Sequence, residues 1–245
     1  MLNVEQLKDD LNKLGNMEKA RMFSRYFKTG PGQYGEGDVF LGVNVPELRE
    51  VAKNYTELGL EELEVLLESK VHEHRFISLI ILIGKYKGGD DEDKKKIFNF
   101  YLRNYKNINN WDLVDLSAPA IVGDYLSDKV EEKQVIYDFA LSDNLWKKRI
   151  SIISTLEFIR NKNFEDTLKI AEILLNDEHD LIHKASGWML REVGKRGGKK
   201  EENAFLQKFY NKMPRTMLRY AIERFPEEER RKYLGKKEER IEHDF

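Results

Sequence analysis

One short segment of the sequence places an aromatic ring and a carboxylate one helical turn apart. Within NNWDLVDLSAPAIVGDYL, residues 109–126, Trp111 and Asp115 are four residues apart and share a face if the segment is helical. The face of an indole ring attracts cations, and an ionised carboxylate stabilises a developing positive charge. The segment therefore has two interpretations, a capped core helix or a site that holds a cation.

The first turn of this segment explains some of its polar residues. Asn109 or Asn110 can cap the helix, and Asp112 then lies where the helix dipole favours an acid. Trp111 can pack against the core as a hydrophobic staple. Asp115 lies one turn deeper, and neither capping nor the dipole explains it.

A second segment, KASGWMLREVGKR, sets a tryptophan among cations. On a helix, one stripe would carry Lys184, Trp188, Arg191 and Lys195. On the opposite face, the side chains of Ala185, Met189 and Val193 would point toward the core, with Leu190 near the boundary. Cations interleaved with an aromatic ring suit a surface that contacts phosphates and exposed bases. Equally, the apolar stems of Lys and Arg can cover a packed tryptophan.

Three consecutive cations follow the predicted start of a helix in SDNLWKKRISIISTLEFIR. We expect Ser142 or Asp143 to cap this helix, which places Lys147, Lys148 and Arg149 within its first two turns. The helix dipole disfavours cations there, so binding of a phosphate is a natural explanation for them. A charged helix surface that faces solvent is the alternative.

The sequence gives little support to metal or thiol chemistry. It contains no cysteine, which excludes disulfides, cysteine-based zinc sites and thiol nucleophiles. His179 and His183 are four residues apart but lack a third ligand at a motif spacing. We expect the five histidines, His72 and His74 among them, to lie at the surface. We predict no metal and no cofactor.

Length and composition indicate a globular protein of the cytoplasm. The 245 residues suffice for one large domain or two small ones, and we predict a single domain over residues 1–245. No run approaches the roughly 20 apolar residues of a membrane span, so we expect no membrane partner. The N-terminus is amphipathic and acidic, unlike a signal or transit peptide. Because the net charge is -2, only local clustering of cations can indicate a nucleic-acid partner.

Apolar residues recur with helical spacing through nearly the whole chain. Clear examples are residues 60–68, 72–86, 94–105 and 165–175, and Gly, Asn, Ser, Asp or Pro residues separate such segments. The predicted helix pairs recur at roughly 35 to 40 residues, which favours an all-α fold, an α-solenoid of HEAT-like repeats with a concave basic face. A compact, non-repetitive helical bundle is the alternative.

Two segments depart from this pattern. The glycine-rich stretch GPGQYGEGD, residues 30–38, precedes a helix that we expect to begin near Pro46. No Gly-Lys-Ser/Thr follows it, so it is not a Walker-type phosphate loop, and we interpret it as a surface turn. Residues 227–245 are of mixed charge, and we expect a solvated terminal helix without a function.

Four motifs, in one order along the chain, carry a resemblance to a known family. They are FLGVNVPELR (40–49), WDLVD with Pro119 and a Gly-Asp pair following (111–124), NLWKKR (144–149) and KASGWMLRE (184–192). In these motifs the chain resembles the alkylpurine DNA glycosylases of the DNA alkylation repair family, which are built from HEAT-like repeats. The resemblance covers most of the chain. It implies excision of N3- or N7-alkylated purines from double-stranded DNA, a reaction for which a monomer suffices, and we expect a monomer.

The resemblance also implies a catalytic set. Asp115 matches the family's catalytic aspartate, Trp111 and Trp188 match the two aromatic residues that line its cleft, and Arg149 matches the arginine beside them. This set agrees with the cation-holding interpretation of Trp111 and Asp115.

Contacts to DNA are expected from a further group of residues. Tyr26, Asn44 and Arg191 fall where the family contacts DNA near the lesion, although Asn44 stands where the family pattern has glutamine. The basic segments described above add to these Lys147, Lys148 and Lys184. The glycine-rich loop is longer than in the best-known pattern of the family and resembles a subgroup feature.

Two other functions are compatible with the sequence. A non-catalytic solenoid that binds DNA structure or lesions would need neither Asp115 nor both tryptophans. A solenoid that scaffolds other proteins would have an apolar or mixed groove, against which the clustered cations argue. For the glycosylase we expect the protein in a bacterial-type cytoplasm, on the nucleoid when it is bound to DNA.

Overall fold

Helices build the whole of the protein that the structure describes. The computed structural model describes residues 3–235, and within this range every regular element is helical. The single β contact there is an isolated parallel bridge between Val39 and Val71. No helix in this range is long and apolar enough to cross a membrane. The all-α prediction is confirmed, and the helices form an α-solenoid of helical repeats.

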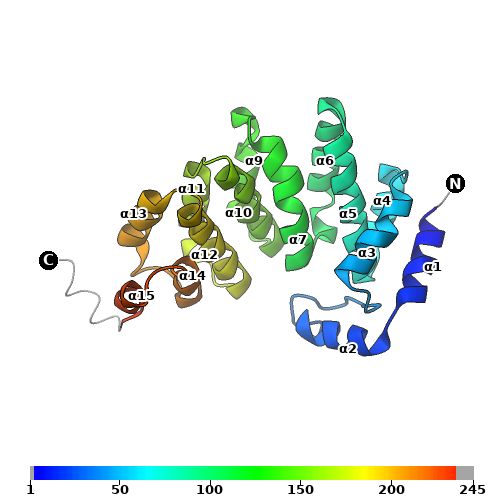
Figure 1. The fold of residues 1–245 in the computed structure, drawn as a ribbon, viewed down its shortest axis with the longest axis horizontal. Coiled ribbons are helices and arrows are strands. Elements are labelled where there is room, and N and C mark those ends of the chain that lie inside the picture. Colours follow the sequence, from blue (N-terminus) through cyan, green and yellow to red (C-terminus); the bar gives the residue numbers. More distant parts are fainter. Residues whose placement is uncertain (1–2, 236–245) are drawn as a thin grey trace. The chain divides into compact units, whose positions relative to one another are not determined.

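The chain divides into two compact units between Tyr125 and Leu126. In the first unit the main helix is α5 (His72–Gly88), which contacts α3, α4, α6 and α7 (Figure 1). The other helices before the boundary are α1 (Val4–Leu14), α2 (Met17–Tyr26), α3 (Val45–Ala52), α4 (Leu60–Leu67), α6 (Asp91–Arg103) and α7 (Trp111–Ala118), and the short helix α8 (Asp124–Leu126) spans the boundary. Short 3-10 turns follow α3 and α6, and a π-helical turn (Pro119–Gly123) follows α7.

The second unit shows the repeat most clearly. Its helices are α9 (Gln134–Ala140), α10 (Leu145–Arg160), α11 (Glu165–Ile173), α12 (Asp180–Lys195), α13 (Lys199–Phe209), α14 (Arg215–Ala221) and α15 (Glu227–Leu234). One row of helices is formed by α10, α12 and α14, each in contact with the next, and α9 contacts α11 in the same way. Because α10, α12 and α14 begin about 35 residues apart, each repeat contributes one helix to the row.

The predicted segments match these helices closely. Each of the four periodic segments is a helix, and the helix expected near Pro46 begins at Val45. The predicted cap of α10 is wrong by one or two residues. Asn144 is the cap, and its Oδ1 accepts hydrogen bonds from the backbone N–H groups of Trp146 and Lys147. The predicted terminal helix is present as α15, and residues 236–245 lie outside the described part of the chain.

The core of the second unit requires a glycine where α12 meets α14. An ideal Cβ at Gly187 would lie 2.4 Å from the carbonyl oxygen of Met217 and 2.6 Å from the Cβ of Tyr220. Both distances are far shorter than van der Waals contact, so any other residue at 187 pushes the two helices apart. The neighbouring side chains of α12 that we expected in the core, Ala185, Met189 and Val193, are fully buried, as is Leu190.

The substitution Gly187→Ala tests this contact. We expect it to lower the free energy of unfolding by roughly 1–3 kcal/mol, because overpacking outweighs the gain in helix propensity. Urea unfolding of the purified protein measures the change.

Gly84→Ala is the matched control in α5. A Cβ there meets nothing within 4 Å, so we expect an increase in stability of up to about 1 kcal/mol. Equal effects of the two substitutions would show that the contact between α12 and α14 does not limit residue 187.

Candidate active site

The first turn of α7 is fixed by Asn110, which is fully buried. Its Oδ1 accepts a hydrogen bond from the backbone N–H of Trp111 at 2.8 Å, so of the two predicted caps Asn110 is the one used. Trp111 and Asp115 are both half-buried on consecutive turns of this helix. The negative charge of Asp115 acts on the hydroxyl group of Tyr101 on α6. Burial raises the pKa of the Tyr101 hydroxyl, and the negative charge of Asp115 raises this pKa further.

Trp111 packs on a cluster of three rings, Phe27, Phe40 and His72, which all contact one another. It stacks on Phe27 with ring centroids 5.2 Å apart, Phe27 stacks on Phe40 at 5.1 Å, and Phe40 stacks on His72 at 4.6 Å. The ring of Tyr26 meets Trp111 edge-on at 5.9 Å. Trp111 therefore has a packing role in the first unit, as the staple interpretation expects. This packing role does not exclude a chemical role for the same ring.

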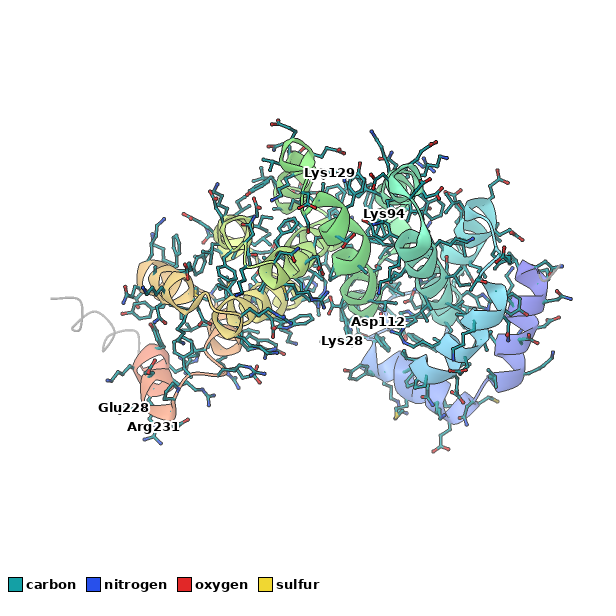
Figure 2. All side chains as sticks on the ribbon, turned by 45° about the horizontal axis from the view of Figure 1, so that its top comes forward. Lys28, Lys94, Asp112, Lys129, Glu228 and Arg231 are labelled. Atoms are coloured by element: carbon teal, nitrogen blue, oxygen red, sulfur yellow. The ribbon has the colours of Figure 1, made fainter. Side chains whose placement is uncertain are left out.

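A buried network of charges adjoins this ring cluster and was not predicted. His72 lies between two carboxylates, with Nε2 2.8 Å from Asp112 Oδ2 and Nδ1 3.3 Å from Asp38 Oδ2. Arg75 Nη2 lies 2.6 Å from the same Asp38 oxygen, and Asn110 Nδ2 donates to it at 3.4 Å. The network joins the glycine-rich loop, α5 and the first turn of α7. Figure 2 shows Asp112 at this end of α7, beside the segment after α2 that carries Lys28.

The prediction of surface histidines is wrong for His72 and His74, which are 3% and 6% exposed. Burial lowers the pKa of His72, but the carboxylates of Asp112 and Asp38 outweigh it and hold this pKa above its ordinary value. Burial lowers the pKa of His74 to about 4, and Lys8 adds to this effect. The sequence held a signal for this burial. In HEHRFISLIILI apolar residues follow on every side of the helix, so the first turn is buried as well.

The loop before α3 is held by a carboxylate from α5. Glu73 is 2% exposed, and its oxygens accept hydrogen bonds from the backbone N–H groups of Leu41, Gly42 and Val43 at 2.8–3.3 Å. Gly42 has a φ of +83°, and a Cβ there would lie 2.2 Å from the carbonyl oxygen of Asn16. These contacts explain why FLGVNV leads into α3 with Asn44 at its N-cap.

A cavity of about 650 Å³ in the first unit brings two expected DNA contacts together. Its walls are largely apolar and include Met22, Phe40, Tyr26 and Asn44, with the carboxylate of Asp112 at one side. Tyr26 is 64% exposed, so its ring is available to a partner. Tyr26 therefore lies beside both the cavity and Trp111.

The three cations of α10 have separate surroundings. Lys147 Nζ lies 5.2 Å from the centre of the Phe139 ring, and Lys148 Nζ forms an ion pair with Asp177 at 2.7 Å. Arg149 is 4% exposed, and its Nη1 donates to the carbonyl oxygen of Leu181 at 2.6 Å. Arg149 thus links α10 to the start of α12, a structural role that the sequence did not indicate.

On α12 the predicted stripe is present. Lys184, Trp188 and Arg191 are half-buried, and Lys195 is exposed. Lys184 forms an ion pair with Asp180 at 2.6 Å, and Arg191 forms one with Glu223. Lys184 and Arg191 line one cavity of about 600 Å³, where two further cations, Arg219 and Arg230, join them.

The two histidines at the start of α12 contact backbone groups with their side chains. His179 caps the helix, because its Nδ1 accepts a hydrogen bond from the N–H of Leu181. His183 Nε2 contacts the carbonyl oxygen of Asp177. Within residues 3–235 no group of three or more His, Asp or Glu side chains is placed to hold a metal ion.

Each unit therefore brings together part of the expected set. In the first unit Tyr26 contacts Trp111, Asn44 shares a cavity with Tyr26, and Asp115 follows Trp111 on α7. In the second unit Lys184 and Arg191 share a cavity, and Arg149 contacts the start of the helix that carries Trp188.

Comparison with known proteins gives two findings. A family model described as DNA alkylation repair enzyme matches residues 7–225. Among solved structures, the fold is similar to that of a protein described as a "predicted DNA alkylation repair enzyme" from Enterococcus faecalis. The TM-score is 0.70 at 18% identity, covering 87% of this chain and 97% of that chain. No curated protein matches the sequence.

The buried carboxylate of Glu73 generates a prediction for this site. Glu73→Gln removes the negative charge that several backbone N–H groups share, so we expect a loss of roughly 1–3 kcal/mol in the free energy of unfolding. We also expect faster proteolysis within residues 39–44. Urea unfolding and limited proteolysis measure the two effects.

Glu61→Gln, an exposed change of the same kind in the first turn of α4, is the control. We expect it to leave both measurements within error of the wild type. A Glu73→Gln protein as stable as this control would show that the carboxylate does not hold the loop.

Proposed function

The chain belongs to the family of DNA alkylation repair enzymes, and from that premise we propose a monofunctional DNA glycosylase. Its substrate is a cationic N3- or N7-alkylated purine in double-stranded DNA, and its reaction is hydrolysis of the N-glycosidic bond. The proposed glycosylase is a single domain over residues 1–245, active as a monomer in the cytoplasm.

The chemistry of the substrate explains why so few residues are needed. Alkylation at N3 or N7 gives the purine a positive charge, so the base leaves without protonation by a general acid. As the glycosidic bond breaks, positive charge moves to the deoxyribose, which becomes oxocarbenium-like. What the protein must supply is a negative charge near the sugar and contacts that hold the DNA.

The observation that carries this proposal is the placement of Trp111 and Asp115. Both are half-buried on consecutive turns of α7, a ring followed by a carboxylate on the same face. Asp115 is proposed to stabilise the oxocarbenium-like sugar or to orient the attacking water. Trp111 and Trp188 are proposed to attract the cationic lesion, each by roughly 0.5–2 kcal/mol.

The remaining residues are proposed to bind the DNA backbone. Arg149, whose carbonyl partner fixes its position, would hold the phosphate beside the lesion. Tyr26 and Asn44 would contact the duplex from the first unit. From the second unit, phosphates would be bound by Lys147, Lys148, Lys184 and Arg191. A direct approach of Asp115 to the sugar requires no pocket for a flipped base.

Asp115→Asn tests the catalytic role. We expect the single-turnover release of 7-methylguanine and 3-methyladenine from methylated duplex DNA to fall by at least about 100-fold, because the neutral amide cannot stabilise the cationic sugar. DNA affinity should change much less.

Asp91→Asn, at an exposed position in the first turn of α6, is the charge-matched control and should retain the wild-type rate. Equal rates for Asp115→Asn and the wild type would remove Asp115 from the mechanism. Absence of release by the wild type, together with tight DNA binding, would support a non-catalytic binding protein.

Phosphate contacts by Lys184 make a separate prediction. DNA affinity should fall steeply with salt, and Lys184→Ala should reduce the slope of log affinity against log salt by about 0.9, the value for one lost phosphate contact.

Lys96→Ala is the matched control, because Lys96 forms an ion pair of the same i,i+4 kind with Glu92. We expect it to leave the slope unchanged. An affinity that does not depend on salt in the wild type would favour protein partners over DNA.

A further inference from the structure

The two ring nitrogens of His72 each face a carboxylate oxygen. Nε2 lies 2.8 Å from Asp112 Oδ2, and Nδ1 lies 3.3 Å from Asp38 Oδ2. A neutral imidazole has one N–H and one lone pair, so one of its nitrogens would then face an anion without a proton between them. Only the imidazolium donates to both carboxylates. The position of the two carboxylates therefore favours the charged form of a side chain that is 3% exposed.

The other charged group at this position is Arg75, from the same helix as His72. Its Nη2 lies 3.4 Å from His72 Nδ1 but only 2.6 Å from Asp38, and its Nη1 donates to the carbonyl oxygen of Ser69. The guanidinium therefore neutralises Asp38 and leaves Asp112 to His72. Besides Asp38, the segment between α2 and α3 places the rings of Phe27 and Phe40 against His72.

Two separate paths lead from His72 to Trp111. Through hydrogen bonds, His72 holds Asp112, whose other oxygen accepts a hydrogen bond from the N–H of Leu113 in the first turn of α7. Through ring contacts, Phe27 connects His72 to the face of the indole, with centroids 5.1 Å from the imidazole and 5.2 Å from Trp111. Both paths end in the turn that carries Trp111 and precedes Asp115.

We propose that His72, as an imidazolium, is a positioning residue for the glycosylase reaction. It fixes the first turn of α7, and with it the Trp111 ring and the Asp115 carboxylate, without contacting the substrate. This inference rests on the proposed function. Loss of the proton leaves Asp112 without a cationic partner and frees the turn to move, so excision slows as pH rises through the pKa of His72.

The experiment measures single-turnover excision of 7-methylguanine and DNA affinity across pH 5.5–9.5 for the wild type, His72→Gln and Asp112→Asn. In the wild type we expect the rate to fall on the alkaline side. In Asp112→Asn that fall should move to lower pH, because the anion that favours the imidazolium is gone. His72→Gln should be slower by roughly 10- to 100-fold and lack that fall, with DNA affinity little changed.

His74→Gln is the matched control. His74 is also buried in the first turn of α5, but its Nδ1 contacts Ser69 Oγ, so it has no link to α7. We expect the excision rate of His74→Gln to fall at alkaline pH as it does in the wild type, even if the stability of the protein falls. If the excision rate falls at the same alkaline pH in the wild type, Asp112→Asn and His72→Gln, the role of His72 is overturned. The glycosylase proposal would remain intact.

A second readout does not depend on catalysis. The indole N–H resonance of Trp111, assigned with Trp111→Phe, should shift with pH in the wild type and in His74→Gln but not in His72→Gln. If the wild type excises nothing, the proposed function fails, and this titration still decides whether His72 controls the position of Trp111. A Trp111 signal that does not respond to pH, or that responds equally in His72→Gln, would overturn the inference.

Discussion

The ion pair between Arg75 and Asp38 is the contact on which the first unit depends. Asp38 closes the glycine-rich loop, and its side chain is 6% exposed. Burial alone would raise the pKa of this carboxyl, but His72 and Arg75 together lower it below its ordinary value. A buried carboxylate without such partners would be strongly destabilising. Because Asp38 is held, the segment that supplies Phe27 and Phe40 can pack against α5, and the ring cluster that contacts Trp111 can form.

The helices could be predicted from the sequence because the buried face of a helix requires apolar residues at a regular spacing. Residues 72–86 and 165–175 were recognised in this way, and so was the side of α12 that carries Lys184 and Trp188. Pairings between distant residues leave no such period. Nothing in the sequence connects Asp38 with His72 and Asp112, which are far apart along the chain and meet only in the folded unit. For the same reason the role of Glu73 and the contact of Arg149 with Leu181 were not predicted.

Structural and chemical roles overlap at the proposed site residues. Trp111 packs on Phe27 and is also the ring proposed to attract a cation. Arg149 joins two helices and is also the proposed phosphate ligand. A side chain that already has fixed partners is held in one position before DNA arrives, so little conformational entropy is lost on binding. For Trp111 this double role explains why the sequence left both a core and a site interpretation open, whereas the structural role of Arg149 became visible only in the fold.

The contact at Gly187 sets how closely α12 and α14 approach, and it does so through backbone atoms that cannot repack. Arg191 on α12 and Arg219 on α14 line the same cavity, so the distance between these two helices governs the spacing of their charges. Flexible surface lysines adapt to any array of phosphates, whereas cations on two helices at a fixed separation match one spacing better than others. A side chain at residue 187 would therefore change the spacing of these cations as well as the packing of the core.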